Sequence, residues 1–349
     1  SIYIKFTMWN INNDINDIIE NGKYFLGELN NKNIFLTGGT GFIGIWILKT
    51  IIQLNHINNA NIKVTVLTRD INRFKKKYPE VFNSKNILFL EGDICNFKFP
   101  NEIFTHVIHG ATDASADLNE KNPLLMYSTI VDGTKHILNF AKKNNGSSFL
   151  FMSSGAVYGN QPYNLKNVNE EFLGGPDIIN TVNCYAESKR AAEMLCSIYC
   201  KQHNVNVKIA RIFALLGPYL SLDIHFAAGN FIKDALDGKE IIVKGNGKPI
   251  RSYLYPTDLI YWLFYMLING RKNIAYNLGS PYGYSIEELA IKVANLIGNK
   301  EYKILGKNDG GWNLGRYVPD ISLIQKESNH VLTVDIDEAI TRTAIWNKK

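Results

Sequence analysis

The segment Thr37–Gly44, TGGTGFIG, places three glycines three residues apart, directly after the apolar run 33–36. In a strand-to-helix turn, the first glycine permits the tight turn, the second lets the backbone approach a pyrophosphate, and the third lets helix pack on strand. The helix that follows contributes N–H groups and the positive end of its dipole. The segment therefore predicts a dinucleotide site rather than an empty glycine-rich turn. Its expected contacts are Gly38, Gly41, Phe42, Ile43 and Gly44.

Short apolar runs alternate with helix-patterned stretches between residues 33 and 212. Such runs, bounded by glycine or polar residues and separated by helices, are typical of βα units whose strands form a parallel sheet. They predict an α/β fold, a Rossmann-type doubly wound parallel sheet. The runs cover 33–36, 63–67, 87–90, 105–109, 148–153 and 207–212, and the helical stretches cover 42–54, 71–78, 122–144 and 185–203.

The pattern changes after residue 217, where helical stretches at 226–237, 256–269 and 285–297 mix with short strand-like pieces. This mixture predicts a smaller mixed α/β C-terminal substrate lobe. Apolar positions within 13–29 predict a helix ahead of the first strand. The expected parts are an N-terminal helical extension (1–30), a Rossmann domain (31–216, with a returning segment near 250–280) and a lobe formed mainly by 217–349.

Composition excludes several classes of function. The 349 residues carry 38 Lys and Arg against 32 Asp and Glu, and this formal charge of +6 is scattered apart from the cluster 75–77. It predicts a solvated surface and no nucleic-acid partner. The four cysteines lack paired C-x-x-C spacing, which predicts reduced thiols and no metal site. No apolar run approaches the ~20 residues that span a bilayer, and residues 1–10 lack a signal-peptide layout, so we expect a cytoplasmic protein without a membrane partner.

The end of the second strand should distinguish the two nicotinamide cofactors. An acidic residue there binds the ribose 2′-hydroxyl of NAD, whereas a nearby Arg accommodates the 2′-phosphate of NADP. Thr68 stands where the acid is expected and Arg69 follows it, which favours NADP slightly; Asp70 taking the acidic role would favour NAD. Asp93 and Ile94, after the third strand, are candidates for the adenine end of the cofactor.

Tyr185 and Lys189 lie four residues apart, on one face of a predicted helix. A free tyrosine has a pKa near 10, and working as a base near neutral pH requires a shift of about three units, or roughly 4 kcal/mol. A neighbouring ammonium and a positively charged nicotinamide ring could supply that field. Upstream, the segment 149–159 runs from a predicted strand into a Ser-Ser turn, and strand ends are where open α/β sheets bind substrates.

These features together resemble the extended short-chain dehydrogenase/reductase family, the NAD(P)-dependent nucleotide-sugar epimerases and dehydratases. The resemblance covers nearly the whole chain after Asn33. Beyond the glycine segment, the Ser-Ser turn and the Tyr-Lys pair, it rests on the motifs at 211–218, 247–258 and 315–320, which follow in the family's order.

The resemblance implies a role for each matching residue. Ser154 would hydrogen-bond the sugar hydroxyl that is oxidised, Tyr185 would take or return its proton, and Lys189 would hold the nicotinamide ribose. Hydride would pass between the nicotinamide and a sugar carbon, most often C4. Arg251 and Arg316 match positions that bind the nucleotide diphosphate, a role suited to the guanidinium fork.

Departures from the family pattern narrow the chemistry. The dehydratases carry an Asp-Glu pair after the Ser/Thr, and the UDP-glucuronate decarboxylases carry a Glu at the second of these positions; here the residues are Gly155 and Ala156. Neither can exchange a proton, so elimination would need an acid from elsewhere. The segment 217–232, which holds the expected substrate contact Asn230, nevertheless resembles the decarboxylases. The nearby candidate acids are Asp223, His225 and Cys184.

The sequence thus predicts an oxidoreductase of nucleotide-sugar metabolism, an NAD(P)-dependent epimerase or 4-keto reductase that binds a nucleotide-diphosphate sugar and forms a homodimer. A dehydratase or decarboxylase of the same fold is the nearest alternative. A redox-sensing binding protein without catalysis is the alternative from another class. The intact Ser154, Tyr185 and Lys189 argue against that last alternative, because a sensor needs no activated phenol.

Overall fold

A computed structural model of the chain describes residues 9–111, 116–223, 227–298, 300–306 and 315–348, and for residues 116 and 117 only the backbone. Its centre is a seven-stranded parallel sheet in the order β3-β2-β1-β4-β5-β6-β9. The predicted Rossmann-type fold is therefore confirmed. The strands are β1 Asn33–Thr37, β2 Lys63–Thr68, β3 Ile87–Glu91, β4 His106–His109, β5 Ser148–Ser154, β6 Asn206–Ile212 and β9 Ala275–Leu278.

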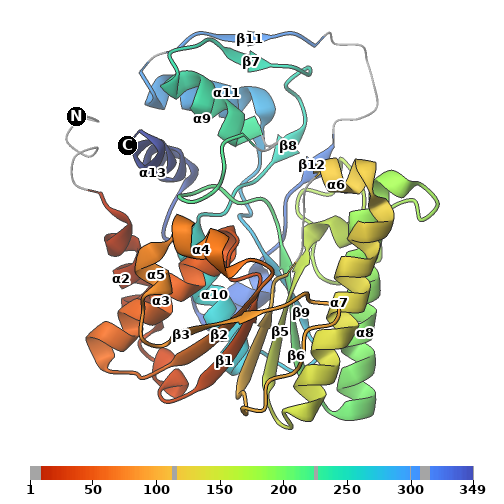
Figure 1. The fold of residues 1–349 in the computed structure, drawn as a ribbon. Coiled ribbons are helices and arrows are strands. Elements are labelled where there is room, and N and C mark those ends of the chain that lie inside the picture. Colours follow the sequence, from red (N-terminus) through yellow and green to blue (C-terminus); the bar gives the residue numbers. More distant parts are fainter. Residues whose placement is uncertain (1–8, 112–115, 224–226, 299, 307–314, 349) are drawn as a thin grey trace.

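Helices cover both faces of this sheet (Figure 1). One layer contains α3 (Phe42–Asn58) and α10 (Pro256–Asn269), and the other contains α7 (Pro123–Lys143) and α8 (Cys184–His203). Two short helices, α4 (Ile71–Lys77) and α5 (Pro79–Phe82), lie against β3. Because both faces are covered, the central strands β1, β4 and β5 are almost entirely buried, and β5 is buried at every position.

Helix ends follow local capping chemistry. The side chain of Asn122 accepts a hydrogen bond from Leu125 N and is followed by a proline at the first helical position of α7. Helix α3 continues four residues past the expected end at 54, through the polar stretch 55–58, and stops where Asn59 takes left-handed backbone angles (φ 50°). The expected end at 54 was predicted from the last buried apolar position. Such positions show where α3 packs on the sheet and do not show where the helix is capped.

The N-terminal helix α2 (Ile11–Gly22) and the short helix η1 (Leu26–Leu29) pack against α3 and α10 and contribute buried side chains to the main core. The buried carboxylate of Asp14 accepts hydrogen bonds from Trp9 Nε1 (3.0 Å), Tyr255 Oη (2.5 Å) and Arg342 (2.8 Å). Arg342 lies on α13 (Ile336–Asn347), so one carboxylate joins the two ends of the described chain.

The chain leaves the sheet after β6, enters the C-terminal lobe, and returns through α10 and β9 before it builds the rest of that lobe. The lobe, at the top of Figure 1, contains α9 (Ala227–Leu236), α11 (Ile286–Leu296) and α13, with α12 (Ser322–Ser328) contacting β9 and α10. It also has two small sheets. One is β10 (Tyr284–Ser285), β8 (Ile250–Arg251) and β12 (Arg316–Tyr317), and the other is β11 (Tyr302–Ile304) and β7 (Ile241–Val243).

Parallel strands end at one edge of the sheet, and this edge faces the lobe (Figure 1). The loops after β1, β2, β4 and β5 therefore lie together. They are joined there by the start of α8 and by α6 (Ala116–Lys121), which contacts α7. This is the edge at which open α/β sheets bind ligands.

Candidate active site at the carboxyl edge of the sheet

Two of the three glycines are required by the protein itself. Gly38 has φ +75°, a left-handed angle that disfavours side chains, and a Cβ there would lie 2.5 Å from the carbonyl of Gly110. A Cβ on Gly44 would lie 2.4 Å from the Gly38 carbonyl oxygen, so this glycine allows α3 to pack on the turn. Both roles agree with those assigned from the sequence.

Gly41 is different. Its backbone is extended (φ −87°, ψ −178°), and the nearest atom to a Cβ there would be 3.4 Å away, an ordinary contact. It is the N-cap of α3 and provides no side-chain hydrogen bond to the first turn, where Phe42 and Ile43 begin the helix. No contact within the described protein requires a glycine here. A bare backbone at an uncapped helix N-terminus fits a bound pyrophosphate.

Thr37 ties this turn to the end of β4. Its hydroxyl lies 2.7 Å from Nδ1 of His109 and accepts a hydrogen bond from Ala111 N (3.1 Å), and His109 Nε2 lies 3.0 Å from the hydroxyl of Thr134. Burial, together with the charge of Lys189, lowers the pKa of His109 to about 3, so the ring is neutral at physiological pH. The sequence reasoning missed this residue, because a histidine in an apolar run carries no spacing signal.

The expected cofactor-selecting residues lie at the end of β2. Thr68 is buried, whereas Arg69 and Asp70 are exposed. The Asp70 carboxylate accepts a hydrogen bond from Arg73 N (2.8 Å) and so caps α4. At the neighbouring loop, Asp93 accepts from Cys95 N (2.8 Å) in a local turn, and Ile94 is buried next to Gly133.

Ser154 and Tyr185 meet at the end of β5. Ser154 is the last residue of that strand, and its hydroxyl accepts a hydrogen bond from Ala156 N (3.1 Å). Tyr185 lies in the first turn of α8, where its backbone N–H donates to Asn119 Oδ1 (2.9 Å). Burial raises the pKa of Tyr185, and the nearby side chain of Ser154 opposes that rise.

Lys189, one helical turn after Tyr185, is 3% exposed and donates from Nζ to the carbonyl oxygen of Met152 (2.8 Å). Its ammonium lies 5.0 Å from the ring centre of Phe151 and 5.9 Å from that of Tyr185. Burial lowers the pKa of Lys189 to about 7, and the charge of Glu193 opposes this shift. The structure therefore assembles the sequence-predicted Ser154, Tyr185 and Lys189 in one place.

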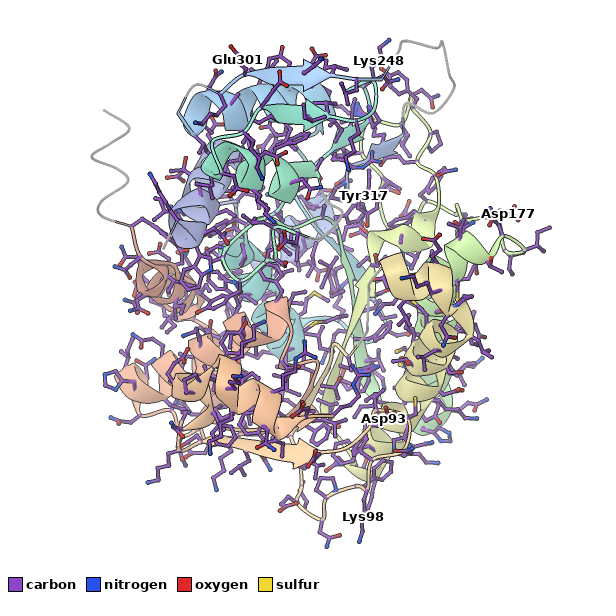
Figure 2. The ribbon with its side chains drawn as sticks, turned by 45° about the horizontal axis from the view of Figure 1, so that its top comes forward. Asp93, Lys98, Asp177, Lys248, Glu301 and Tyr317 are labelled. Carbon is purple, nitrogen blue, oxygen red and sulfur yellow. The ribbon has the colours of Figure 1, made fainter. Side chains whose placement is uncertain are left out.

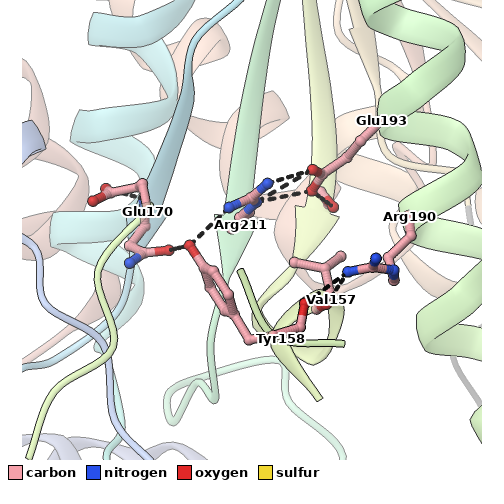
Figure 3. A network of polar contacts seen from close by, with 9 residues as sticks. Val157, Tyr158, Glu170, Arg190, Glu193 and Arg211 are labelled. Atoms are coloured by element: carbon pink, nitrogen blue, oxygen red, sulfur yellow. Dashed lines mark hydrogen bonds and ion pairs between the residues drawn. The ribbon is translucent and has the colours of Figure 1, made fainter. Parts of the chain in front are cut away.

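A buried network supports this group (Figure 3). Glu193 accepts from the Ser153 hydroxyl (2.5 Å) and forms an ion pair with Arg211 of β6 (2.7 Å). Arg211 also donates to the Tyr158 hydroxyl (2.9 Å), which donates to Asn277 of β9 (2.7 Å). The sequence analysis did not predict this network. Two signals were present, because Glu193 stands four residues after Lys189 and Arg211 is the first residue of the motif at 211–218.

The two arginines expected at the diphosphate lie on neighbouring strands. Arg251 of β8 stands opposite Tyr317 of β12, and Arg316 stands opposite Ile250. Paired residues share a face of a sheet, so the two arginines belong to opposite faces of this strand pair. Arg251 donates to the carbonyl oxygens of Ile250 (2.9 Å) and Gly315 (2.8 Å), and Nε of Arg316 is buried with no hydrogen-bond partner among the described residues.

Two of the three positions expected to provide an acid are described, and both have other partners. Asp223 is exposed and paired with Lys233, and the Cys184 thiol donates to the carbonyl oxygen of Pro123 (3.1 Å). His225 lies outside the described residues. Asn230, expected to contact substrate, is half-buried on α9. In the described parts of the chain no group of His, Cys, Asp and Glu could hold a metal ion, and none of the helices there is long and apolar enough to cross a membrane.

Comparison with known proteins identifies the family to which this chain belongs. The model of the NAD dependent epimerase/dehydratase family matches residues 34–279, and the chain belongs to that family. UDP-glucuronic acid decarboxylase 1 of Xenopus tropicalis is 30% identical over 275 residues, which cover 79% of this chain and 62% of that protein. UDP-glucuronic acid decarboxylase 6 of Arabidopsis thaliana is 31% identical over 285 residues, covering 80% of this chain and 77% of the relative.

Solved structures show the same fold at lower identity. A dTDP-glucose 4,6-dehydratase from Bacillus anthracis, crystallised with NAD, aligns with a TM-score of 0.76 at 21% identity and covers 91% of this chain and 96% of its own. A UDP-glucuronic acid 4-epimerase from Bacillus cereus, crystallised with UDP-glucuronic acid and NAD, gives 0.76 at 21% identity, with 90% and 99% covered. At 21% identity these two structures show that the chain shares their fold.

The buried position of Lys189 predicts a pH-dependent stability. Its pKa of about 7 lies below the ordinary value of 10.5, so the unfolded chain binds more protons between these values and stability rises with pH across that window. We expect Lys189→Met to lose this pH dependence, because methionine carries no charge to bury. The variant should therefore exceed wild type in unfolding free energy by more near pH 7 than near pH 9.5, and the two differences should differ by on the order of 3 kcal/mol.

Urea unfolding at both pH values measures this difference. Lys201→Met, which removes an exposed lysine from the same helix, is the matched control and should show no such dependence. Equal pH dependence in wild type and Lys189→Met would contradict the burial of this charge.

Proposed function

We propose that this chain is an NAD(P)-dependent epimerase or 4-keto reductase of nucleotide-diphosphate sugars that acts at a sugar carbon, C4. The observation that carries the proposal is the assembly of Ser154, Tyr185 and Lys189 beside the glycine turn. Gly41 and the N-terminus of α3 would hold the cofactor pyrophosphate, and Lys189 the nicotinamide ribose. When bound, the cofactor accepts a hydride from the sugar carbon or returns it.

The protein's own groups manage the proton that accompanies the hydride. Tyr185 would take the proton of the sugar hydroxyl as the carbon is oxidised, and return it when the ketone is reduced. Ser154 would hold that hydroxyl beside the Tyr185 oxygen. The protonated Lys189, close to the Tyr185 ring, favours the phenolate by its charge. Each of these roles needs a buried, water-poor site, and Ser154 and Lys189 are both less than a tenth exposed.

The loop after Ser154 favours an outcome without elimination. Gly155 and Ala156 have no proton to give. A Cβ on Gly155 would meet the ring of Phe213 and the hydroxyl of Tyr317, with no carboxylate among its nearest atoms. Dehydration would therefore lack an acid for the departing hydroxyl. If neither water nor carbon dioxide is lost, the 4-keto sugar receives hydride again, on the same or the other face.

The curated relatives favour a second candidate, decarboxylation of UDP-glucuronic acid. A ketone at C4 of that sugar stands β to the C6 carboxylate, so carbon dioxide can leave while the ketone accepts the electron pair. This step needs a proton at C5 afterwards but no acid at the leaving group. The absence of a carboxylic acid at position 156 therefore opposes dehydration more strongly than decarboxylation.

Product mass distinguishes these outcomes. With UDP-glucuronic acid, UDP-glucose and dTDP-glucose as substrates, we expect products of unchanged mass or two hydrogens apart, analysed by mass spectrometry and NMR. A product lighter by one carbon dioxide, formed only from UDP-glucuronic acid, would identify a decarboxylase, and loss of water would identify a dehydratase. Tyr185→Phe is the control and should lower the rate by about 10²–10⁴-fold, the usual contribution of a general base.

We further propose that the cofactor is NADP. The exposed Arg69 at the end of β2 supports this, as does the use of Asp70 to cap α4. Arg69→Ala should weaken NADP binding about tenfold or more and leave NAD binding nearly unchanged, because only NADP has the 2′-phosphate that forms a charge-assisted bond. Calorimetric titration of both cofactors measures this. Equal weakening of both would contradict the assignment, and Arg73→Ala on the neighbouring helix is the control.

We also propose a cytoplasmic homodimer. Exposed apolar side chains on the outer layer of helices support the dimer: Leu124 and Tyr127 of α7, and Met194 and Ile198 of α8. A monomer in sedimentation equilibrium at micromolar concentration would contradict it.

A further inference from the structure

A second group of polar side chains lies at the other end of the central strands. Ser148 is the first residue of β5 and Ser154 is the last, so the two serines stand at opposite edges of the sheet. The carboxyl edge, where Figure 2 labels Tyr317, faces the lobe, and Ser148 lies at the amino edge. A cavity of about 570 Å³ opens at that amino edge, within the usual range for small-molecule sites. Its lining includes Lys32, Ile103, His106, Ser148, Lys208 and Ile268.

The register of the sheet places these polar residues on one face. His106 of β4 pairs with Ser148 of β5, and Ser148 pairs with Asn206 of β6. Directly paired residues share a face, and so do residues two apart in one strand, so Lys208 belongs to the same face. The Ser148 hydroxyl donates to the carbonyl oxygen of Leu267 on α10 (2.6 Å). Polar side chains from three neighbouring strands therefore meet beside the last turn of α10.

The ammonium of Lys208 is buried and has unused hydrogen-bond donors. The residue is 2% exposed, and its Nζ donates to the Ser148 hydroxyl oxygen (2.6 Å). An ammonium has three N–H donors, and lysine is almost never fully buried without a charged partner. In the described part of the chain Lys208 forms no ion pair and no other hydrogen bond. Two donors and a positive charge are therefore available to a ligand in the cavity.

His106 adds a hydrogen-bond acceptor. The Thr105 hydroxyl donates to the carbonyl oxygen of Asn33 (3.0 Å) and lies 2.9 Å from Nδ1 of His106. Because a hydroxyl has a single proton, Nδ1 must be the donor to Thr105, and Nε2 of the neutral ring is left as an acceptor. Among the described residues Nε2 has no hydrogen-bond partner. Burial and the charges of Lys208 and Lys32 lower the pKa of His106 to about 4, so the ring is neutral near pH 7.

The charges around the cavity are mainly positive. Glu28 of η1 is the one acidic residue in the described lining, and its side chain is exposed. Opposite it stand Lys32 and Lys208. Burial, together with the charge of Lys272, lowers the pKa of Lys208 to about 8, so Lys208 is still mostly charged near pH 6. A cavity with this balance attracts an anion.

We propose that this cavity binds the phosphate group of a small molecule. A phosphate dianion has two charges, which match the ammonium groups of Lys208 and Lys32, and its oxygens accept the two free donors of Lys208. Its second pKa is near 6, so close to that pH one proton is shared between a phosphate oxygen and Nε2 of His106. Ile103 and Ile268 form an apolar wall beyond the phosphate, which suits the organic part of a phosphomonoester.

The His106 ring reports binding at this cavity. Protein labelled with ¹⁵N at histidine is titrated by NMR with inorganic phosphate at pH 6, and the His106 resonances are identified by their loss in His106→Gln. Ionic strength is held constant with sodium chloride, because salt alone screens the lysine charges. A bound anion should raise the pKa of His106 by about one unit or more. The Nε2 resonance should therefore move towards that of a protonated ring and reach saturation.

Lysine variants test the two cations. Lys208→Met keeps the length of the side chain and should weaken phosphate binding about tenfold or more, the usual effect of losing a charge-assisted hydrogen bond. It should also raise the pKa of His106 before phosphate is added, which verifies that the variant is folded with the two groups adjacent. Lys32→Met should weaken binding as well. Lys63→Met is the control, because Lys63 is exposed at the first position of β2, on the same edge of the sheet.

Two further probes distinguish the ligands. Tighter binding of phenyl phosphate than of inorganic phosphate supports a phosphomonoester, and equal binding supports free phosphate. An equal shift of His106 with acetate overturns the assignment to phosphate. The absence of a saturable shift at millimolar phosphate, or equal binding by wild type, Lys208→Met and Lys32→Met, overturns the site. These measurements need no turnover, so their outcome is independent of the proposed function.

Discussion

The ion pair between Glu193 and Arg211 is the contact on which the catalytic edge depends. It joins α8 to β6, and the same carboxylate accepts the Ser153 hydroxyl at the end of β5. Through Tyr158 and Asn277 the contact reaches β9 and the loops near residues 168 and 320. A buried pair contributes little net stability, but loss of one partner leaves an uncompensated charge. The pair therefore contributes more to the position of α8 relative to β5 and β6 than to the stability of the fold.

This contact also sets the electrostatics of the site. Lys189 is one turn before Glu193 on α8, and the carboxylate favours its charged form against the effect of burial. Burial outweighs the effect of Glu193, which also pairs with Arg211, so the pKa of Lys189 lies near neutrality, at about 7. With its pKa near neutrality, Lys189 can become protonated when Tyr185 is a phenolate, and it needs no carboxylate paired with it alone. The charge on the lysine and the position of the tyrosine thus have one structural origin.

Much of the architecture could be predicted from local patterns, because six of the seven strands of the sheet, all but β9, lie on predicted apolar runs and each long helix has an apolar face. The glycine segment and the Tyr185–Lys189 pair were equally accessible, since spacing within one element is fixed by its geometry. The place of Tyr317 was not accessible, because the approach of its hydroxyl to Gly155 depends on the path of the whole lobe. The same holds for Asp14, whose partners lie near the other end of the chain, and for the opposite faces taken by Arg251 and Arg316.

The buried carboxylate of Asp14 also bears on how the chain is made. On the ribosome, α2 emerges long before α13, because Arg342 follows Asp14 by more than three hundred residues. At a synthesis rate of about 5–20 residues per second, the Asp14 carboxylate is without the Arg342 guanidinium for about fifteen seconds or longer. Helix α2 can dock on α3 during that time, but its charge is neutralised only when α13 arrives. Helix α2 is therefore made early, but its buried charge gains its partner only late.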